Sequence, residues 1–150
     1  MKMNRRYVSA DSVWVASDRH GVLGVFDSRG SGPIPTVVID ATADKDCDAH
    51  AALLDLPVVG KANHLSMDWD PVYTQLAERG LFVFDWMTPG HGGDQYWLVA
   101  IPERPITWAD LSPEVAAIVV ELSFPNAEYG SERYLTSTGD VEFADAYSAM

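Results

Sequence analysis

The sequence predicts a single α+β domain, with a mainly antiparallel sheet and two or three helices. The length of 150 residues and the hydrophobic content of 47% suit one globular domain with a sizeable core. Short runs rich in β-branched and aromatic residues are separated by tight turns, which is typical of hairpins. Strands and helices do not alternate regularly along the chain, and this favours an α+β over a parallel α/β architecture.

The first predicted element is a hairpin. Residues 12–17 and 22–26 are strand-like and flank the turn Asp18-Arg19-His20-Gly21. The Gly- and Pro-rich stretch 28–35 predicts a loop, and Thr36-Val37-Val38-Ile39 then predicts a further strand.

Two amphipathic helices are expected in the middle of the chain. The first ends at about Leu56, because Pro57 follows it, and the second runs from Pro71 to Arg79 and stops at Gly80. Aspartates stand where N-caps are needed: Asp46 or Asp48 for the first helix, and Asp68 or Asp70 for the second.

A second strand pair is predicted after Gly80. Residues 81–86 and 95–101 are strand-like, and the Gly-rich turn between them favours direct pairing. Residues 111–114, Leu-Ser-Pro-Glu, resemble a helix start, whereas Ala116 to Leu122 fits a helix or a buried strand equally well.

The charge of the chain is strongly acidic and unevenly distributed. Ten Lys and Arg stand against 22 Asp and Glu, for a formal net charge of −12, and residues 1–6 hold three of the bases as a basic arm. An anionic body lacks the counterion-release gain that drives binding to nucleic acid or to anionic lipid, so neither partner is expected. The same field attracts a basic protein, although acidity that only maintains solubility is the competing explanation.

The cellular compartment of the protein and the order of its C-terminal residues can be predicted from simple sequence features. No stretch approaches the roughly 18 apolar residues of a membrane span, and Cys47 is alone, so no internal disulfide can form. These features predict a cytoplasmic protein. Residues 144–150 are expected to be loosely held.

No complete catalytic or metal-binding motif is present. Asp44, Asp46 and Asp48 imitate the spacing of a calcium loop, but Ala49 occupies the sixth position, where such a loop needs Gly. Acids at a helix N-terminus explain the spacing more simply. The four histidines, with Cys47, do not reach the ligand count of a zinc site, so we expect no metal and no cofactor.

Two clusters of tryptophan and carboxylate are candidates for binding a basic partner. The sequence places Trp69 between Asp68 and Asp70, and Trp86 after Asp85. A carboxylate beside an indole can receive Lys or Arg through charge pairing and cation–π contact. Packing of both tryptophans in the core, with the acids as caps, is the alternative. Asp44, Asp46 and Asp48 could extend the same surface.

A small enzyme or small-molecule binder is the rival prediction. Its pocket would lie between the turn Gly30 to Pro35 and the loop Thr88 to Asp94, where His91 could act with Asp94 or Asp85 as an acid–base pair.

A resemblance favours the binding hypothesis. The segments Trp14 to Phe26, Gly30 to Pro35 and Arg79 to Trp86 resemble small bacterial proteins of the immunity-protein type, found in polymorphic toxin systems. The resemblance implies a small, acidic, cytosolic protein that neutralises a toxin domain by binding rather than by catalysis. It assigns no individual binding residue.

Overall fold

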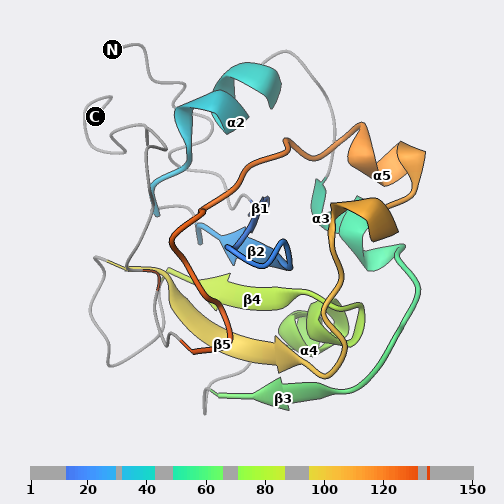
Figure 1. Cartoon of the computed structure of the whole chain (residues 1–150). Coiled ribbons are helices and arrows are strands. Elements are labelled where there is room, and N and C mark those ends of the chain that lie inside the picture. The colour runs from blue at the N-terminus through green and yellow to red at the C-terminus, as the bar shows by residue number, and fades with distance from the viewer. Residues whose placement is uncertain are drawn as a thin grey trace.

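The computed structural model describes residues 13–29, 32–42, 49–65, 71–86, 95–131 and 135. Its centre is a five-stranded mixed sheet in the order β1-β2-β4-β5-β3, accompanied by short helices, which confirms the α+β prediction (Figure 1). The strands are β1 (Val13–Ser17), β2 (Leu23–Asp27), β3 (Ala62–His64), β4 (Phe82–Asp85) and β5 (Trp97–Pro102). The helices are α2 (Thr36–Thr42), α3 (Ala49–Leu54), α4 (Pro71–Glu78), α5 (Pro113–Ala116) and the 3-10 turn η1 (Trp108–Asp110).

The sheet is mainly antiparallel, as predicted. β1 pairs with β2 as a hairpin, and β5 pairs antiparallel with both β4 and β3. β2 and β4 pair in parallel, so the carboxyl ends of these two strands lie at the same edge of the sheet. The three-residue strand β3, which the sequence did not predict, forms the edge of the sheet beyond β5.

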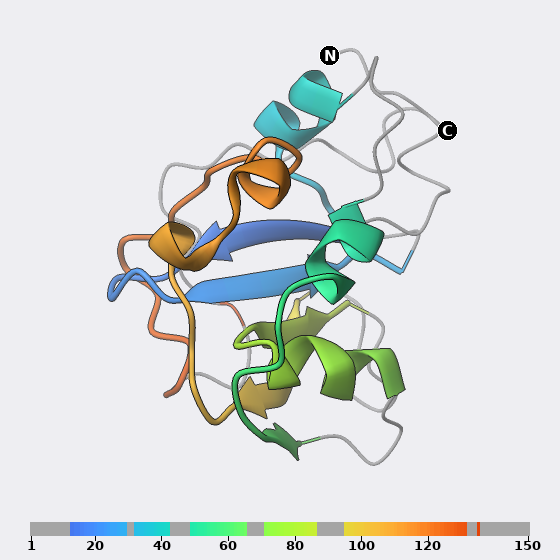
Figure 2. The same cartoon turned by 90° about the vertical axis from the view of Figure 1, so that its right-hand side faces the viewer.

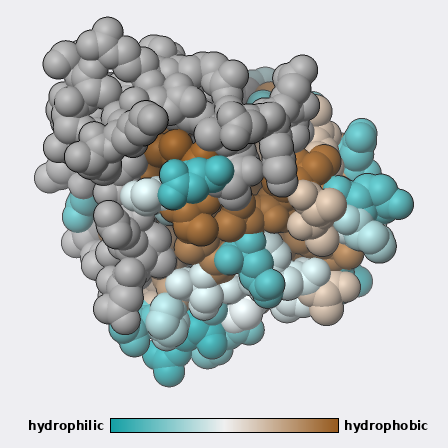
Figure 3. All heavy atoms as spheres, turned by 90° about the horizontal axis from the view of Figure 1, so that it is seen from above, coloured by the Kyte–Doolittle hydropathy of each residue, from teal (hydrophilic) through white to brown (hydrophobic). Residues whose placement is uncertain are grey.

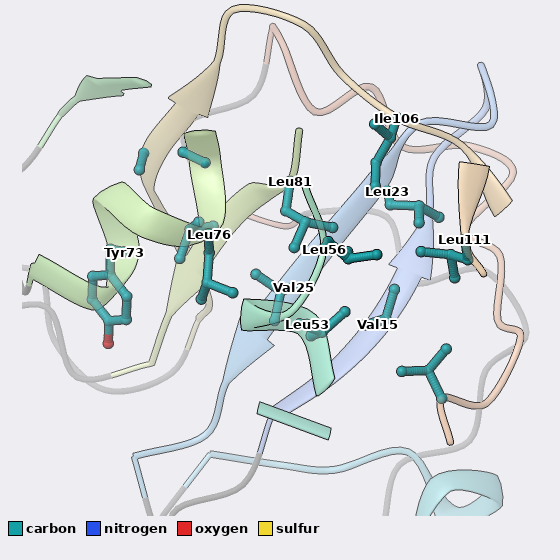
Figure 4. Close-up of a cluster of buried hydrophobic side chains, with 14 of the residues drawn as sticks. Val15, Leu23, Val25, Leu53, Leu56, Tyr73, Leu76, Leu81, Ile106 and Leu111 are labelled. Atoms are coloured by element: carbon teal, nitrogen blue, oxygen red, sulfur yellow. The ribbon is translucent and has the colours of Figure 1, made fainter. Parts of the chain in front are cut away.

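The side chains of the sheet alternate between two hydrophobic cores. Val15, Val25 and Val83 point to the face on which α3, α4, η1 and α5 lie, where Leu53 and Leu56 of the α3 segment meet Leu76 of α4 (Figures 2 and 4). The opposite face packs against residues of α2 and of the chain from Phe124 to Leu135. Because both faces are buried, the strands read as continuous apolar runs.

Aromatic rings link three strands on the α2 face. Trp14 stacks on Phe26 with 4.2 Å between ring centroids, and Phe26 stacks on Phe84 at 4.5 Å. Both contacts join residues that are partners in the strand register. Tyr96 packs edge-on against Trp14 and Phe26, and Tyr129 packs edge-on against Phe84.

The two later helices agree with their sequence signals. α4 begins at Pro71, and the chain reverses at Gly80, whose φ of +94° lies in the left-handed region that favours glycine. α5 is capped by Ser112, whose hydroxyl oxygen accepts the amide hydrogen of Val115 at 3.3 Å. The stretch from Ala117 to Leu122 is neither of the two predicted structures, because α5 ends at Ala116 and turns follow it.

The predicted strand at residues 36–39 is wrong. These residues form the first turn of α2, in which the amides of Val38 and Ile39 both donate to the carbonyl of Pro35. Val38 and Ile39 are buried side by side in the core while Val37 is 47% exposed, and adjacent buried residues suit a helix better than an alternating strand. Tertiary packing therefore overrides the β-propensity of the sequence.

A substitution at Gly80 should be strongly destabilising. A Cβ added to Gly80 would lie 2.6 Å from Ile106 Cγ2 and 2.8 Å from the Arg104 carbonyl oxygen, in addition to the strain of a positive φ. We expect Gly80→Ala to lower the free energy of unfolding by about 2–3 kcal/mol in urea denaturation. Gly130→Ala is the control, because a Cβ there meets nothing within 4 Å. Equal losses in the two variants would contradict this account.

Candidate functional site

Two aspartates meet where the parallel strands β2 and β4 end. Asp27 and Asp85 are register partners, and Asp85 is only 4% exposed. Arg29 comes two residues after β2, and its Nη1 lies 3.6 Å from the Asp85 Oδ2. The backbone of Arg29 has a φ of +52°, a conformation that costs a residue with a side chain about 1 kcal/mol.

Hydrogen bonds hold Arg29 in this strained position. The Arg29 amide donates to Asp27 Oδ1 at 3.0 Å, and its guanidinium donates to the Tyr73 hydroxyl at 3.3 Å. Tyr73, from α4, donates its own hydroxyl hydrogen to Asp27 Oδ2 at 3.0 Å. The bond to Tyr73, together with the carboxylate of Asp85, raises the pKa of Arg29, and burial raises the pKa of Tyr73.

A pair of aromatic side chains adjoins this cluster. Trp86 packs against Tyr96 with 5.0 Å between ring centroids, and the Tyr96 hydroxyl donates to the Pro33 carbonyl at 2.8 Å. Gly32 fits tightly between them, because a Cβ there would lie 2.7 Å from the Tyr96 hydroxyl and 2.8 Å from Trp86 Cγ. The structure therefore brings the described part of the 30–35 turn against the end of β4, where the rival prediction placed one wall of a pocket.

The structure describes two of the predicted site residues, Asp85 and Trp86. Asp85 and Trp86 lie inside the domain, where Trp86 is 8% exposed, so their positions fit the packing alternative better than an exposed binding surface. The remaining candidates lie outside the described residues: Asp44, Asp46, Asp48, Asp68, Trp69, Asp70, His91 and Asp94.

Two described histidines bond residues outside the Asp27 and Asp85 cluster. His20, in the β1–β2 turn, pairs with Glu128 at 2.8 Å on the surface, and this bond lowers the pKa of Glu128. His64 of β3 bonds Thr74 of α4 at 2.7 Å. Within the described ranges no three His, Cys, Asp or Glu residues are grouped as a metal site, and no helix there has the length and apolar character to cross a membrane.

Sequence patterns did not single out the exposed acids of the helical segments. Five of them form no ion pair with another described residue: Asp40 of α2, Asp55 after α3, Asp110 of η1, Glu114 of α5 and Glu121 beyond it. No local signal marks these acids, because each is a single carboxylate in an ordinary polar position. Figure 3 shows the molecule from the side of α2 and α5, where apolar side chains gather with hydrophilic ones around them.

A groove separates the α3 and α5 segments. It has a volume of about 480 Å³ and is lined by Ala52, Asp55, Leu56, Pro57, Asp110, Leu111, Ser112, Glu114, Val115 and Ile118. Three of the five exposed acids are in this lining, and none of the described residues that form it is Lys, Arg or His. In Figure 2 the α3 and α5 segments that border it face the viewer. The groove thus combines apolar surface with uncompensated negative charge.

The Arg29–Tyr73 contact can be measured by a double-mutant cycle. Tyr73→Phe removes the hydroxyl that bonds both Arg29 and Asp27, and should lower the free energy of unfolding by about 1–3 kcal/mol. Combined with Arg29→Ala, it should show a coupling of about 1 kcal/mol in urea denaturation. The control cycle uses Tyr96→Phe, whose hydroxyl bonds Pro33 and Trp14 instead, and its coupling to Arg29→Ala should stay below about 0.5 kcal/mol. Similar couplings in both cycles would contradict a specific contact between Arg29 and Tyr73.

Stability should fall in alkali because of two buried phenols. Burial raises the pKa of both Tyr73 and Tyr96 above the ordinary value of 10.0. Above that pH the unfolded chain releases these protons while the folded chain keeps them, so the free energy of unfolding decreases as pH rises. Each phenol contributes up to about 1.4 kcal/mol per pH unit. Urea denaturation between about pH 9 and 11 should therefore show a smaller slope for Tyr73→Phe and for Tyr96→Phe than for the parent, and an unchanged slope in both would refute this prediction.

Comparisons with known proteins were made at the level of family, sequence and structure. The scan against family models, the search of curated proteins and the search of solved structures each found no match to this chain. The functional interpretation therefore rests on the residues and geometry described above.

Proposed function

We propose that this protein is a non-enzymatic acidic binding protein that neutralises a cationic protein domain, in the manner of an immunity protein. The observation that carries the proposal is the set of five exposed acids on and beside the helical segments, which form no ion pair with another described residue. Carboxylates that no base of the described residues neutralises attract a basic partner over a distance of about 8–10 Å at ordinary salt and speed its encounter.

The described bases do not compensate these acids. Arg29 belongs to the buried cluster, and Arg79 donates its guanidinium hydrogens to the carbonyls of Leu54 and Gln75. The other described bases, Arg19, Lys61 and Arg104, form no ion pair with these five acids, and the Lys61 amide donates to Glu103. The helical segments thus keep an anionic surface, which supports a partner of opposite charge.

A small-molecule site is the second candidate. The observation that favours it is the tight packing of Gly32 on Trp86 and Tyr96, beside the partly buried Asp27 and the buried Asp85. An aromatic wall next to a carboxylate pair suits a cationic or polar ligand. Gly32→Ala should weaken binding of such a ligand, whereas a protein that acts by capturing a basic partner should bind that partner unchanged.

The proposed function is tested by affinity capture and charge neutralisation. The full chain serves as bait in a lysate of the source cells, and bound proteins are washed at about 0.05 M and then 0.5 M salt. We expect one basic partner that raised salt releases. Purified partner should then bind about tenfold or more weakly to a variant with Asp40→Asn, Asp55→Asn, Asp110→Asn, Glu114→Gln and Glu121→Gln.

A control variant keeps these five acids and changes two other carboxylates. Glu78→Gln combined with Glu103→Gln should bind the partner nearly as well as the parent. Thermal melting of all variants checks that the fold is retained. A partner that is neutral, or one whose affinity is independent of salt and of the five acids, would contradict the proposal.

A further inference from the structure

The groove between the α3 and α5 segments offers side chains for recognition. Its lining comes from α3, η1, α5 and the residues that follow them, so it holds no strand whose backbone could pair with an incoming strand. A partner in this groove must therefore be recognised through side chains, as when a helix lies in a groove. The volume of 480 Å³ falls within the range of about 300–1,000 Å³ that is usual for binding sites.

The floor of the groove is apolar and firmly supported. Leu56, Leu111 and Val115 are each less than 10% exposed and belong to the core cluster that also holds Val15 and Leu53 (Figure 4). Ala52 and Ile118 are partly exposed and complete the apolar surface. An apolar side chain that enters the groove meets a rigid surface, which lowers the entropic cost of binding.

The carboxylates of the groove are placed at its edges, and one of them is fixed. Asp110 accepts hydrogen bonds from the Thr107 amide at 2.8 Å and from the Thr107 hydroxyl at 3.3 Å, both at Oδ2. Asp55 and Glu114 are exposed on the α3 and α5 sides. Three negative charges without a base in the lining select a ligand that carries several positive charges.

We propose that the groove binds a basic amphipathic helix of the cationic partner, whose apolar side chains meet Leu56, Leu111 and Ile118. Lysines or arginines of this helix reach Asp55, Asp110 and Glu114. This inference rests on the proposed function and names the surface and the recognition mode. A second copy of this chain fits less well, because its net charge of −12 opposes self-association.

The test uses defined peptides and the full chain. The probe is a 14-residue peptide, a length of about four helical turns, with lysine and leucine at helical spacing. Two comparison peptides have the same composition in scrambled order, or glutamate in place of lysine. In an amide NMR titration of the full chain, we expect the probe to shift residues 52–57 and 110–118. The comparison peptides should bind at least about tenfold more weakly.

Matched triple variants distinguish binding in the groove from attraction to the overall negative charge of the protein. Asp55→Asn, Asp110→Asn and Glu114→Gln together should weaken the probe about tenfold, whereas Glu78→Gln, Glu103→Gln and Glu128→Gln together should weaken it less than about threefold. Ala52→Phe, which fills the groove from α3, should weaken the probe without changing the net charge. Equal losses in the two triple variants, shifts outside the groove, or salt-dependent dimerisation in place of peptide binding would overturn the groove assignment.

The outcomes also separate this inference from the proposed function. A basic protein partner that the groove triple variant still captures at full affinity would refute the groove and leave the function standing. Specific binding of the probe in the groove, combined with a captured partner that is not basic, would refute the function and leave the groove as a helix-binding surface.

Discussion

The aromatic ladder of Trp14, Phe26 and Phe84 is the interaction on which the rest of the structure depends. Its two stacked contacts join β1 to β2 and β2 to β4, and each contact is made by residues that are partners in register. A slip of one residue in either pairing would place each ring opposite a side chain of the other face and lose the stacked contact of that pair. The ladder therefore fixes how the hairpin joins the parallel strand.

The same register sets the arrangement of charge at the sheet edge. An aspartate follows Phe26 on β2 and Phe84 on β4. Because Phe26 lies opposite Phe84, Asp27 lies opposite Asp85. Two neighbouring carboxylates at one edge need a positive charge and hydrogen-bond donors. Arg29 and Tyr73 supply them, and Arg29 adopts a left-handed backbone to do so. Packing on one face thus determines the electrostatics at the end of the strands.

Local sequence signals predicted the helices whose ends are marked by a capping residue, a proline or a glycine. Gly80 after α4 and Ser112-Pro113 before α5 act through the backbone of their own segment, so they can be read without the fold. Thr36 to Ile39 could not be read in this way, because Val38 and Ile39 are placed by the core they join. The acidic groove was unpredictable for the same reason, since Asp55 and Asp110 are far apart in sequence and meet only when α3 and η1 pack on one face. Asp85 and Trp86 are neighbours in sequence, but strand and core geometry place both inside the domain.

The aspartates of the described chain divide into two groups with opposite roles. Asp18 and Asp85 are buried; Asp18 accepts the amide hydrogens of His20, Val22 and Tyr129, and Asp85 faces Arg29. Their charge is matched within the fold and gives little attraction at the surface. Asp55 and Asp110 are exposed beside an apolar groove whose described lining residues include no base. Repulsion among such unpaired acids costs the free protein stability, and a cationic partner relieves that cost when it binds. In the proposed binding mode, the apolar floor and the carboxylates beside it would act together to select a basic amphipathic helix over a basic segment without apolar side chains.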